Sequence, residues 1–256
     1  MLEEARAALR KQADPERAEF LKGFFRTCSG GYGEGDRLLG VTVPKTREIA
    51  RQFRSMPLKE VIKLLQSKFH EERLLALVLL SIRFAKGDRA EVHRVYLDNL
   101  RYINNWDLVD VSAPLIVGEY FLDPPAKKAA DSDGSTLAVR RSSRAIHLRA
   151  RSFLSKLARS KNLWERRISI ISTLAFIRAG QTAHTLAISK ILLKDREDLI
   201  QKAVGWMLRE AWKREPEPVE DFLTEHHHEM PRTMLRYAIE KMPQEQRLSY
   251  LHGTVA

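Results

Sequence analysis

The stretches NLWERRISIISTLAF (residues 162–176) and DLIQKAVGWMLREAW (residues 198–212) decide the fold class. Each carries apolar residues at helical spacing and is entered through a polar turn, and their starts lie 36 residues apart (198 minus 162). Similar helices begin near Glu71 and near Asn105, which are 34 residues apart. A period of roughly 30 to 47 residues is typical of paired-helix repeats. The sequence therefore predicts an all-α solenoid built from helix pairs.

Helical periodicity continues through most of the remaining chain. We expect helices at 58–85 with a break near 67–72, and at 91–101, 106–121, 147–159, 163–179, 182–193, 198–213, 217–226 and 232–241. Glycine and proline fall between these segments, where helices end. No convincing alternating strand pattern occurs, which supports an all-helical chain.

One connection is longer than the repeat allows. Asn105 and Asn162 are 57 residues apart, which exceeds one repeat by about 20 residues. The excess corresponds to residues 124–145, PPAKKAADSDGSTLAVRRSSRA, which are rich in Pro, Ala, Ser and Arg. We expect an inserted mobile basic loop here, with a short hairpin around Asp133-Gly134 as one option. Apart from this insertion, residues 1–256 are expected to form a single repeat domain.

The charge of the chain is positive and unevenly distributed. Lys and Arg number 44 against 33 Asp and Glu, a net charge of +11. Between Pro124 and Arg167 there are twelve basic and three acidic residues, a local charge of +9. A clustered basic surface indicates a polyanionic partner, of which nucleic acid is the commonest. A solvated face that serves solubility is the alternative.

Several classes of protein are disfavoured by composition. No run of eighteen apolar residues occurs, and the N-terminal stretch lacks an apolar signal segment, so a cytoplasmic protein is expected. A monomer is the default for a solenoid with polar end helices. A single cysteine, Cys28, excludes an internal disulfide and a cysteine-based zinc site. His226, His227 and His228 are interpreted as an exposed turn, and neither a metal nor a cofactor is expected.

A glycine-rich stretch, CSGGYGEGDRLLGV (residues 28–41), does not match a phosphate-binding glycine motif. We interpret it as a flexible connection, with phosphate or groove contact as the alternative. Pro44 is expected to open the helix that follows.

The stretch NNWDLVD (residues 104–110) carries the strongest candidate chemistry. Trp106 and Asp110 are four positions apart, so a helix places them on one face. Asn104 or Asn105 is a suitable N-cap, and Asp107 lies in the first turn, where a carboxylate stabilises the helix dipole. Asp110 has no comparable structural explanation, although a buried Asp paired with an Arg is the alternative.

Pro114 follows Asp110 at the fourth position. A proline there removes the helical donor of the Asp110 carbonyl, so the helix should bend at this point.

The repeat spacing connects these residues to the later helices. Arg166 and Arg167 open the helix of LWERR, and Trp206 follows 39 residues after Arg167. Equivalent positions of successive repeats line one concave surface, so Trp106, Asp110, one of the arginines and Trp206 are expected to converge. A core position for Trp206 is the alternative. Indole faces and an ionised carboxylate attract cations, and positive charge develops on a deoxyribose when its glycosidic bond breaks.

Five segments in this order resemble one known family. They are LLGVTVPKTREIAR (38–51), NNWDLVD, LWERR (163–167), IQKAVGWMLRE (200–210) and MPRTMLRYAIEK (230–241). The sequence resembles the DNA alkylation repair proteins of the AlkD type, which are HEAT-like-repeat DNA glycosylases, over about residues 20–245 apart from 124–145. The resemblance implies a right-handed superhelical solenoid with a concave basic groove. It also implies a catalytic set made of Trp106, Asp110, Arg167 and Trp206.

The resemblance further implies a monofunctional glycosylase that excises N3- and N7-alkylated purines from duplex DNA and leaves an abasic site, without flipping the base. The position that probes the minor groove in that family falls within Thr42-Val43. DNA contacts are expected from Thr42, Lys45, Arg47, Arg140, Arg141, Arg144, Arg166, Lys202, Arg209 and Arg232. A non-catalytic binder of damaged or branched DNA and, less favoured, a protein-binding HEAT scaffold are the alternatives.

Overall fold

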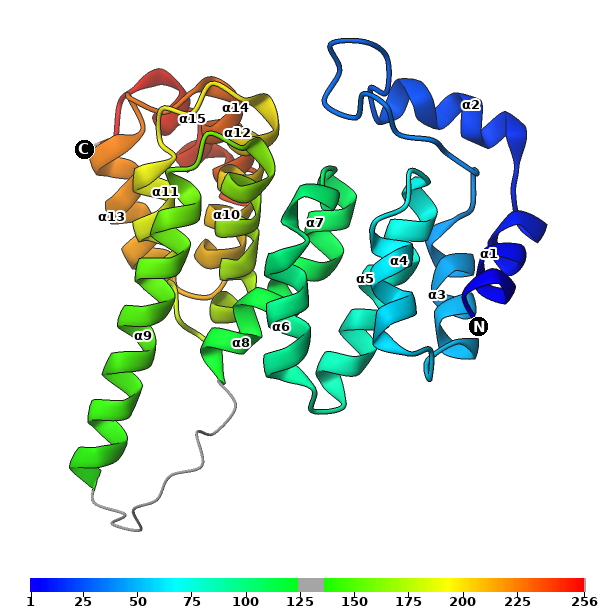
Figure 1. Ribbon diagram of the computed structural model, residues 1–256. Helices are drawn as coiled ribbons and strands as arrows, with labels where there is room; N and C mark the ends of the chain where they lie inside the picture. The colour runs from blue at the N-terminus through cyan, green and yellow to red at the C-terminus, as the bar shows by residue number, and fades with distance from the viewer. Residues whose placement is uncertain (124–135, 256) are drawn as a thin grey trace. The chain divides into compact units, whose positions relative to one another are not determined.

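The computed structural model describes residues 1–123 and 136–255, and for residues 136–144 and 146 it describes the backbone alone. The chain divides into two compact units, residues 1–116 and 117–256 (Figure 1). Helices account for all regular structure in the described part, apart from one isolated bridge between Arg37 and Phe69. The predicted all-α class is therefore confirmed, whereas the expected single domain stays a prediction. No helix in the described ranges has the length and apolarity needed to span a bilayer.

The first unit is organised around helix α5. Its helices are α1 (Leu2–Lys11), α2 (Pro15–Phe24), α3 (Val43–Gln52), α4 (Leu58–Leu65), α5 (His70–Ala85), α6 (Arg89–Asp98) and α7 (Trp106–Ala113). Helix α5 packs against α1, α3, α4, α6 and α7. Its apolar side chains are buried on nearly every face, which is expected of a helix enclosed by neighbours. The break predicted at 67–72 separates α4 from α5.

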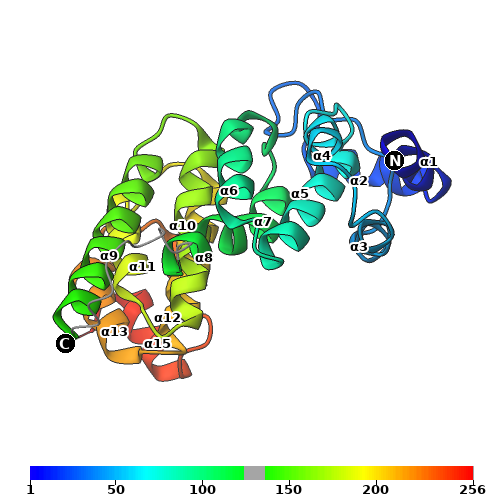
Figure 2. The same ribbon diagram turned by 60° about the horizontal axis from the view of Figure 1, so that its bottom comes forward.

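The second unit consists of helices stacked in two layers (Figures 1 and 2). Its helices are α8 (Glu119–Leu122), α9 (Thr136–Ala158), α10 (Leu163–Arg178), α11 (Ala183–Ile191), α12 (Asp198–Trp212), α13 (Pro216–His226), α14 (Arg232–Ala238) and α15 (Gln244–His252). Helix α10 packs against α12, and α12 against α14, to form one layer, while α9, α11 and α13 form the other. The two stretches that predicted the repeat are α10 and α12, neighbours in the same layer.

The α-helical pattern changes at Pro114, and the bend predicted there stays a prediction. Helix α7 ends at Ala113, and a π-helical turn, Pro114–Gly118, follows it directly. A proline cannot donate to the carbonyl four residues earlier, so the turn widens instead of continuing the α-helical ladder.

The prediction of a loop over 124–145 is wrong for its last ten residues. Helix α9 begins at Thr136, so residues 136–145 are helical. The physical reason is that residues 136–145 contain neither proline nor glycine, and Ala, Leu and Arg, which favour helix, outnumber serine there. Residues 124–135, including the hairpin option at Asp133-Gly134, lie outside the described residues.

The prediction of an exposed turn is wrong for His226. Helix α13 extends through this residue, whose side chain is 5% exposed and packs edge-on against Phe222 with ring centroids 4.8 Å apart. His228 is exposed, as expected. Apolar residues four positions earlier on a helix bury His226, and the run of three histidines gave no indication of this.

Candidate functional site

Trp106 and Asp110 line one cavity in the first unit. The Asn105 side chain accepts a hydrogen bond from the Trp106 N–H (2.8 Å) and so caps the start of α7. Both Trp106 and Asp110 are half-buried, one helical turn apart. Their cavity, called the Trp106 cavity below, has a volume of about 290 Å³ and is also lined by Arg17, Leu21, Phe24, Phe25, Val41, Val43, His70, Glu71, Leu74, Asp107 and Val111.

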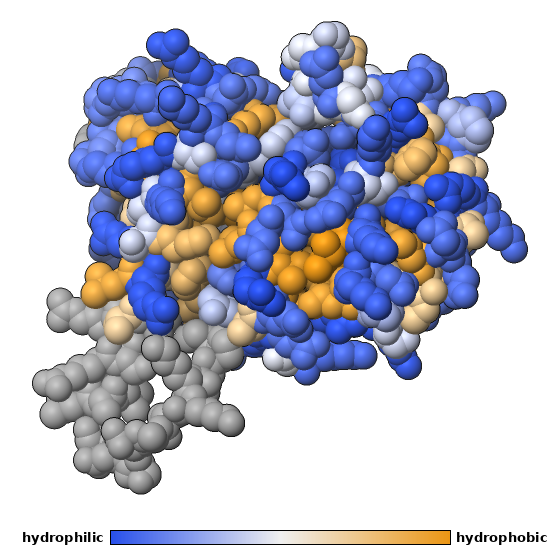
Figure 3. Space-filling view, in the orientation of Figure 1, coloured by the Kyte–Doolittle hydropathy of each residue, from blue (hydrophilic) through white to orange (hydrophobic). Residues whose placement is uncertain are grey.

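Aromatic rings surround the indole of Trp106. Its ring centroid lies 5.6 Å from that of Phe24, at 71°, and 5.7 Å from that of Phe25, at 42°. Phe24 is 51% exposed, and Phe20 on the same side of α2 is 72% exposed. Figure 3 shows that the face of the molecule in this view carries apolar patches between hydrophilic residues. An exposed aromatic pair beside the cavity offers flat apolar surface to a sugar or a base.

A buried charged cluster fixes the start of α7. His70 is 2% exposed; its Nε2 is 2.7 Å from Asp107 Oδ2 and its Nδ1 is 3.3 Å from Asp36 Oδ2. Arg73 also donates to Asp36 Oδ2 (2.7 Å). These four residues, the His70 cluster, connect α5, α7 and the glycine-rich stretch. The His70 ring stacks on Phe25 at 4.7 Å, and Phe25 contacts Trp106 in turn.

The cluster is charged at neutral pH. Burial lowers the pKa of His70, but the hydrogen bonds to Asp107 and Asp36 outweigh it and raise the pKa to about 9. Burial raises the pKa of Asp36, and the hydrogen bond with His70 and the charge of Arg73 reverse this and hold the pKa below its ordinary value. The imidazolium therefore donates from both ring nitrogens.

Glu71 holds the end of the glycine-rich stretch against α5. Its carboxylate accepts hydrogen bonds from the N–H groups of Leu39 (2.9 Å) and Gly40 (2.8 Å). Gly40 has φ +81°, and a Cβ there would lie 2.1 Å from the Asp14 carbonyl oxygen. Only glycine fits this position. The stretch interpreted as a flexible connection is thus fixed at its end and forms one wall of the Trp106 cavity through Val41.

The two arginines of LWERR are engaged within the second unit. Arg167 is 5% exposed, and its Nη1 donates to the Leu199 carbonyl (2.5 Å), which connects α10 to α12. Arg166 donates through Nε to Asp195 (2.7 Å) and through Nη1 to the carbonyls of Ser160 and Lys161. Little of either guanidinium faces solvent.

Trp206 is half-buried on α12 and is not a core residue. It lines a cavity of about 540 Å³ together with Leu174, Ile177, Arg178, Glu210, Lys213 and Arg214. Trp106 and Asp110 thus share a cavity in the first unit, and Arg167 and Trp206 lie on adjacent helices of the second. Convergence of all four residues stays a prediction.

The residues expected to contact DNA differ in how far their side chains are engaged. Lys45 and Arg47 are exposed in the first turns of α3, and Thr42 directly precedes that helix. Lys45 Nζ lies 3.4 Å from Glu48 Oε2. In the second unit, Lys202 pairs with Asp198 (2.7 Å), Arg209 pairs with Glu210 and Glu240, and Arg232 donates to the Leu251 carbonyl (2.9 Å). The side chains of Arg140, Arg141 and Arg144 lie outside the described residues.

The sequence reasoning missed the residues that support the cavity. His70, Glu71 and Arg73 belong to the run HEER at the start of α5, which was interpreted only as a helix break. The available signal was a run of four titratable residues at the start of a segment that is otherwise strongly apolar. Partner residues 34 and 37 positions away, Asp36 and Asp107, carry no local signal.

Fold and cavity together define an all-helical protein of stacked helix pairs with an aromatic and acidic cavity at a helix start. The family model described as DNA alkylation repair enzyme matches residues 5–132 and 130–242, and the chain belongs to this family. A solved structure from Enterococcus faecalis, described as a predicted DNA alkylation repair enzyme, is similar with a TM-score of 0.63 and 18% identity, covering 91% of this chain and 98% of that one. At this identity the likeness shows the fold. No curated protein matches the sequence. Membership of the family supports a DNA repair role with DNA as the partner.

Proposed function

We propose that the protein is a monofunctional DNA glycosylase that excises cationic N3- and N7-alkylated purines from duplex DNA and leaves an abasic site. The observation that supports this most directly is the pairing of Trp106 and Asp110 in one cavity with aromatic walls. A carboxylate beside flat rings is suited to a sugar that becomes positively charged.

The substrate itself supplies most of the driving force. An N7- or N3-alkylpurine carries a positive charge, so the electron pair of the C1′–N9 bond leaves with the purine and neutralises it. No general acid is needed for this departure. The sugar is left as an oxocarbenium ion, water adds to C1′ and loses a proton, and the product is an abasic site with a free neutral base. The base does not need to leave the stack for this reaction, in contrast to most glycosylases.

Asp110 is proposed to stabilise the oxocarbenium ion and to orient or deprotonate the attacking water. Trp106 would lie against the deoxyribose and add dispersion and attraction for its developing charge. His70 and Asp107 hold the first turn of α7, from which Trp106 projects, and Asp110 follows one turn later on the same helix. A carboxylate fixed in this way needs little reorganisation when the charge appears.

In the second unit, Trp206 is proposed to contact the sugar from another side, and Arg167 to hold a phosphate and keep Asp110 ionised. Duplex contacts would come from exposed cations such as Lys45 and Arg47 at the start of α3. The basic concave groove of a superhelical solenoid and a monomeric state form part of this proposal.

One observation favours the second candidate, a non-catalytic binder of damaged or branched DNA. Arg167 is 5% exposed and donates to a backbone carbonyl, so its capacity to contact a phosphate is restricted. A binder could use the same exposed cations without this contact.

Release of 7-methylguanine from methylated duplex DNA, measured by mass spectrometry, tests the proposal. Asp110→Asn should keep duplex affinity but lower the rate of release by about 10²- to 10³-fold, as loss of one transition-state contact does.

The matched control is Asp98→Asn, which removes one exposed carboxylate from α6 of the same unit and should release the base at the wild-type rate. If the wild type binds the duplex and releases no alkylated base, the protein is the binder. If Asp110→Asn and the wild type release the base equally fast, Asp110 has no part in the reaction.

A further inference from the structure

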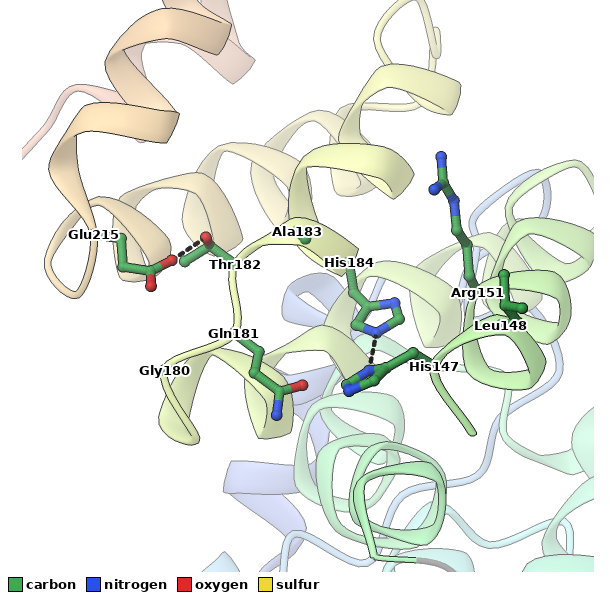
Figure 4. Close-up of a pocket in the computed structure, with 9 residues that line it drawn as sticks. All are labelled: His147, Leu148, Arg151, Gly180, Gln181, Thr182, Ala183, His184 and Glu215. Atoms are coloured by element: carbon green, nitrogen blue, oxygen red, sulfur yellow. Dashed lines mark hydrogen bonds between the residues drawn. The ribbon is translucent and has the colours of Figure 1, made fainter. Parts of the chain in front are cut away.

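A second cavity lies in the other half of the chain, within residues 117–256. It has a volume of about 720 Å³, within the usual range for small-molecule sites. It opens between α9, the α10–α11 turn and the α12–α13 turn (Figure 4). The lining residues are His147, Leu148, Arg151, Gly180, Gln181, Thr182, Ala183, His184 and Glu215, and we call it the His147 pocket. Leu148 is the one large apolar side chain among them, and Arg151, Glu215 and the two histidines are titratable.

Two histidines form the centre of the His147 pocket. His147 Nδ1 and His184 Nε2 are 3.1 Å apart, with ring centroids at 5.4 Å and planes at 24°. The rings therefore meet edge to edge, with the two nitrogens facing each other at hydrogen-bond distance. The pKa of His184 is lowered to about 4, mainly by burial and to a smaller extent by the charges of His147 and Arg151.

This geometry does not suit a metal ion. A metal held by both histidines requires lone pairs that converge on a point beside the N–N line, whereas these nitrogens point at each other. Over the described ranges, no group of three or more His, Cys, Asp or Glu is arranged to hold a metal.

The two ends of the pocket carry opposite charges. Figure 4 shows Arg151 on one side of the histidine pair and Glu215 with Thr182 on the other. Thr182 donates its hydroxyl hydrogen to the Glu215 carboxylate, which fixes that carboxylate at the rim. Arg151 is exposed on α9, and its charge reaches His184. A ligand that fits this pattern has an anionic group at one end and a hydrogen-bond donor at the other.

Backbone and amide groups between the two ends are left for a ligand. Thr182 precedes α11, its side chain makes no capping hydrogen bond, and its hydroxyl donates to Glu215. The first N–H groups of a helix have no partner within that helix, and those of α11 begin at Ala183, which lines the pocket. The Gln181 Oε1 atom is buried and accepts no hydrogen bond from the described residues, so it can accept one from a ligand.

We propose that the His147 pocket binds a phosphate-bearing molecule with hydroxyl groups, a nucleotide in the simplest case. The phosphate pairs with Arg151 at one end of the pocket, and a hydroxyl donates to Glu215 at the other. A guanidinium is the side chain best matched to a phosphate, and a carboxylate accepts from a ribose hydroxyl. The site goes beyond the proposed glycosylase activity and shares no residue with it. A free nucleotide and a nucleic acid backbone are the two sources of such a phosphate.

Calorimetric titration of the full chain with AMP and with inorganic phosphate tests the proposal. The wild type should bind AMP with a Kd below about 1 mM, and Arg151→Gln should weaken it by about 10- to 100-fold, the range for a lost charged hydrogen bond. The matched control is Arg149→Gln, an exposed arginine of the same helix outside the pocket, which should bind AMP as the wild type does. Glu215→Gln should reduce the preference for AMP over inorganic phosphate.

Competition between AMP and unmodified duplex DNA assigns the source of the phosphate. Displacement of AMP by duplex, with duplex affinity lost in Arg151→Gln but kept in Arg149→Gln, supports a nucleic acid phosphate. AMP binding that duplex does not affect supports a free nucleotide. The proposal is wrong if AMP does not bind, or if Arg149→Gln weakens AMP as much as Arg151→Gln. Release of 7-methylguanine by the wild type is a separate measurement, so failure of one proposal is distinguishable from failure of the other.

Discussion

Helices α5 and α10 have the same length and the same position at the centre of their units, but different polar residues are buried in them. Each has 16 residues. Helix α5 buries four titratable side chains in its first turn, the run HEER (70–73). Glu72, for example, pairs with Arg6 at 3.0 Å and is 1% exposed. Burial of such groups is tolerated only with close partners of opposite charge.

Helix α10 buries mainly hydroxyl groups instead. Ser169 donates to the Leu154 carbonyl of α9 (2.7 Å), and Ser172 and Thr173 donate to carbonyls of their own helix. These hydrogen bonds are neutral and do not depend on pH. The difference teaches that buried ion pairs hold the start of α5 beside the Trp106 cavity, whereas hydroxyl contacts hold the buried middle of α10. Four substitutions can break or sharpen this comparison.

The largest effect is expected where the glycine-rich stretch meets α2. Gly40→Ala introduces a Cβ 2.1 Å from the Asp14 carbonyl oxygen at φ +81°, and should lower the free energy of unfolding by about 3 to 5 kcal/mol. Gly180→Ala in the second unit has a similar φ of +73° with nothing within 4 Å, and should cost only about 1 to 2 kcal/mol. Urea denaturation of both variants provides the measurement. Equal costs would mean that the close contact at Gly40 relaxes in solution.

The next effect concerns the His70 cluster and its dependence on pH. His70 has a folded pKa of about 9 against an ordinary 6.5, so its ion pairs contribute fully below about pH 6.5 and are lost as the pH rises through 9. His70→Gln should therefore cost about 2 to 3 kcal/mol at pH 6, and clearly less at pH 10. The measurement is the difference in unfolding free energy between wild type and variant at both values. A difference independent of pH would show that His70 is neutral in the folded protein.

The smallest effect is expected in the second unit. Ser169→Ala removes the donor to the Leu154 carbonyl and should cost about 1 kcal/mol, equally at pH 6 and pH 10. The same unfolding experiment serves as the measurement. A cost that changes with pH as that of His70→Gln does would remove the distinction between the two units.

Local signals account for what the sequence predicted correctly. The Asn105 cap and the Trp106–Asp110 spacing each depend on residues within a few positions, and the helical period fixes the stacking of α10 with α12. These signals depend on backbone geometry, which is the same in any helical protein.

Long-range partners account for what the sequence could not give. His70 and Asp107 are 37 positions apart, and nothing near either residue indicates the other. Arg167 lies near the start of α10, and its Nη1 donates to the Leu199 carbonyl, 32 positions away, which no local signal indicates. Composition also led to the wrong prediction of a loop at residues 136–145, which are helical, because serine and arginine occur both in loops and in solvated helices.

The carboxylate of Glu71 has a consequence for motion. Leu39 and Gly40 donate their amide protons to it from a stretch without regular structure. Exchange of these two protons with solvent requires the Glu71 carboxylate to separate from the end of the glycine-rich stretch. Two amides outside any helix should therefore exchange as slowly as helical ones, and their exchange rate measures how often the wall of the Trp106 cavity opens.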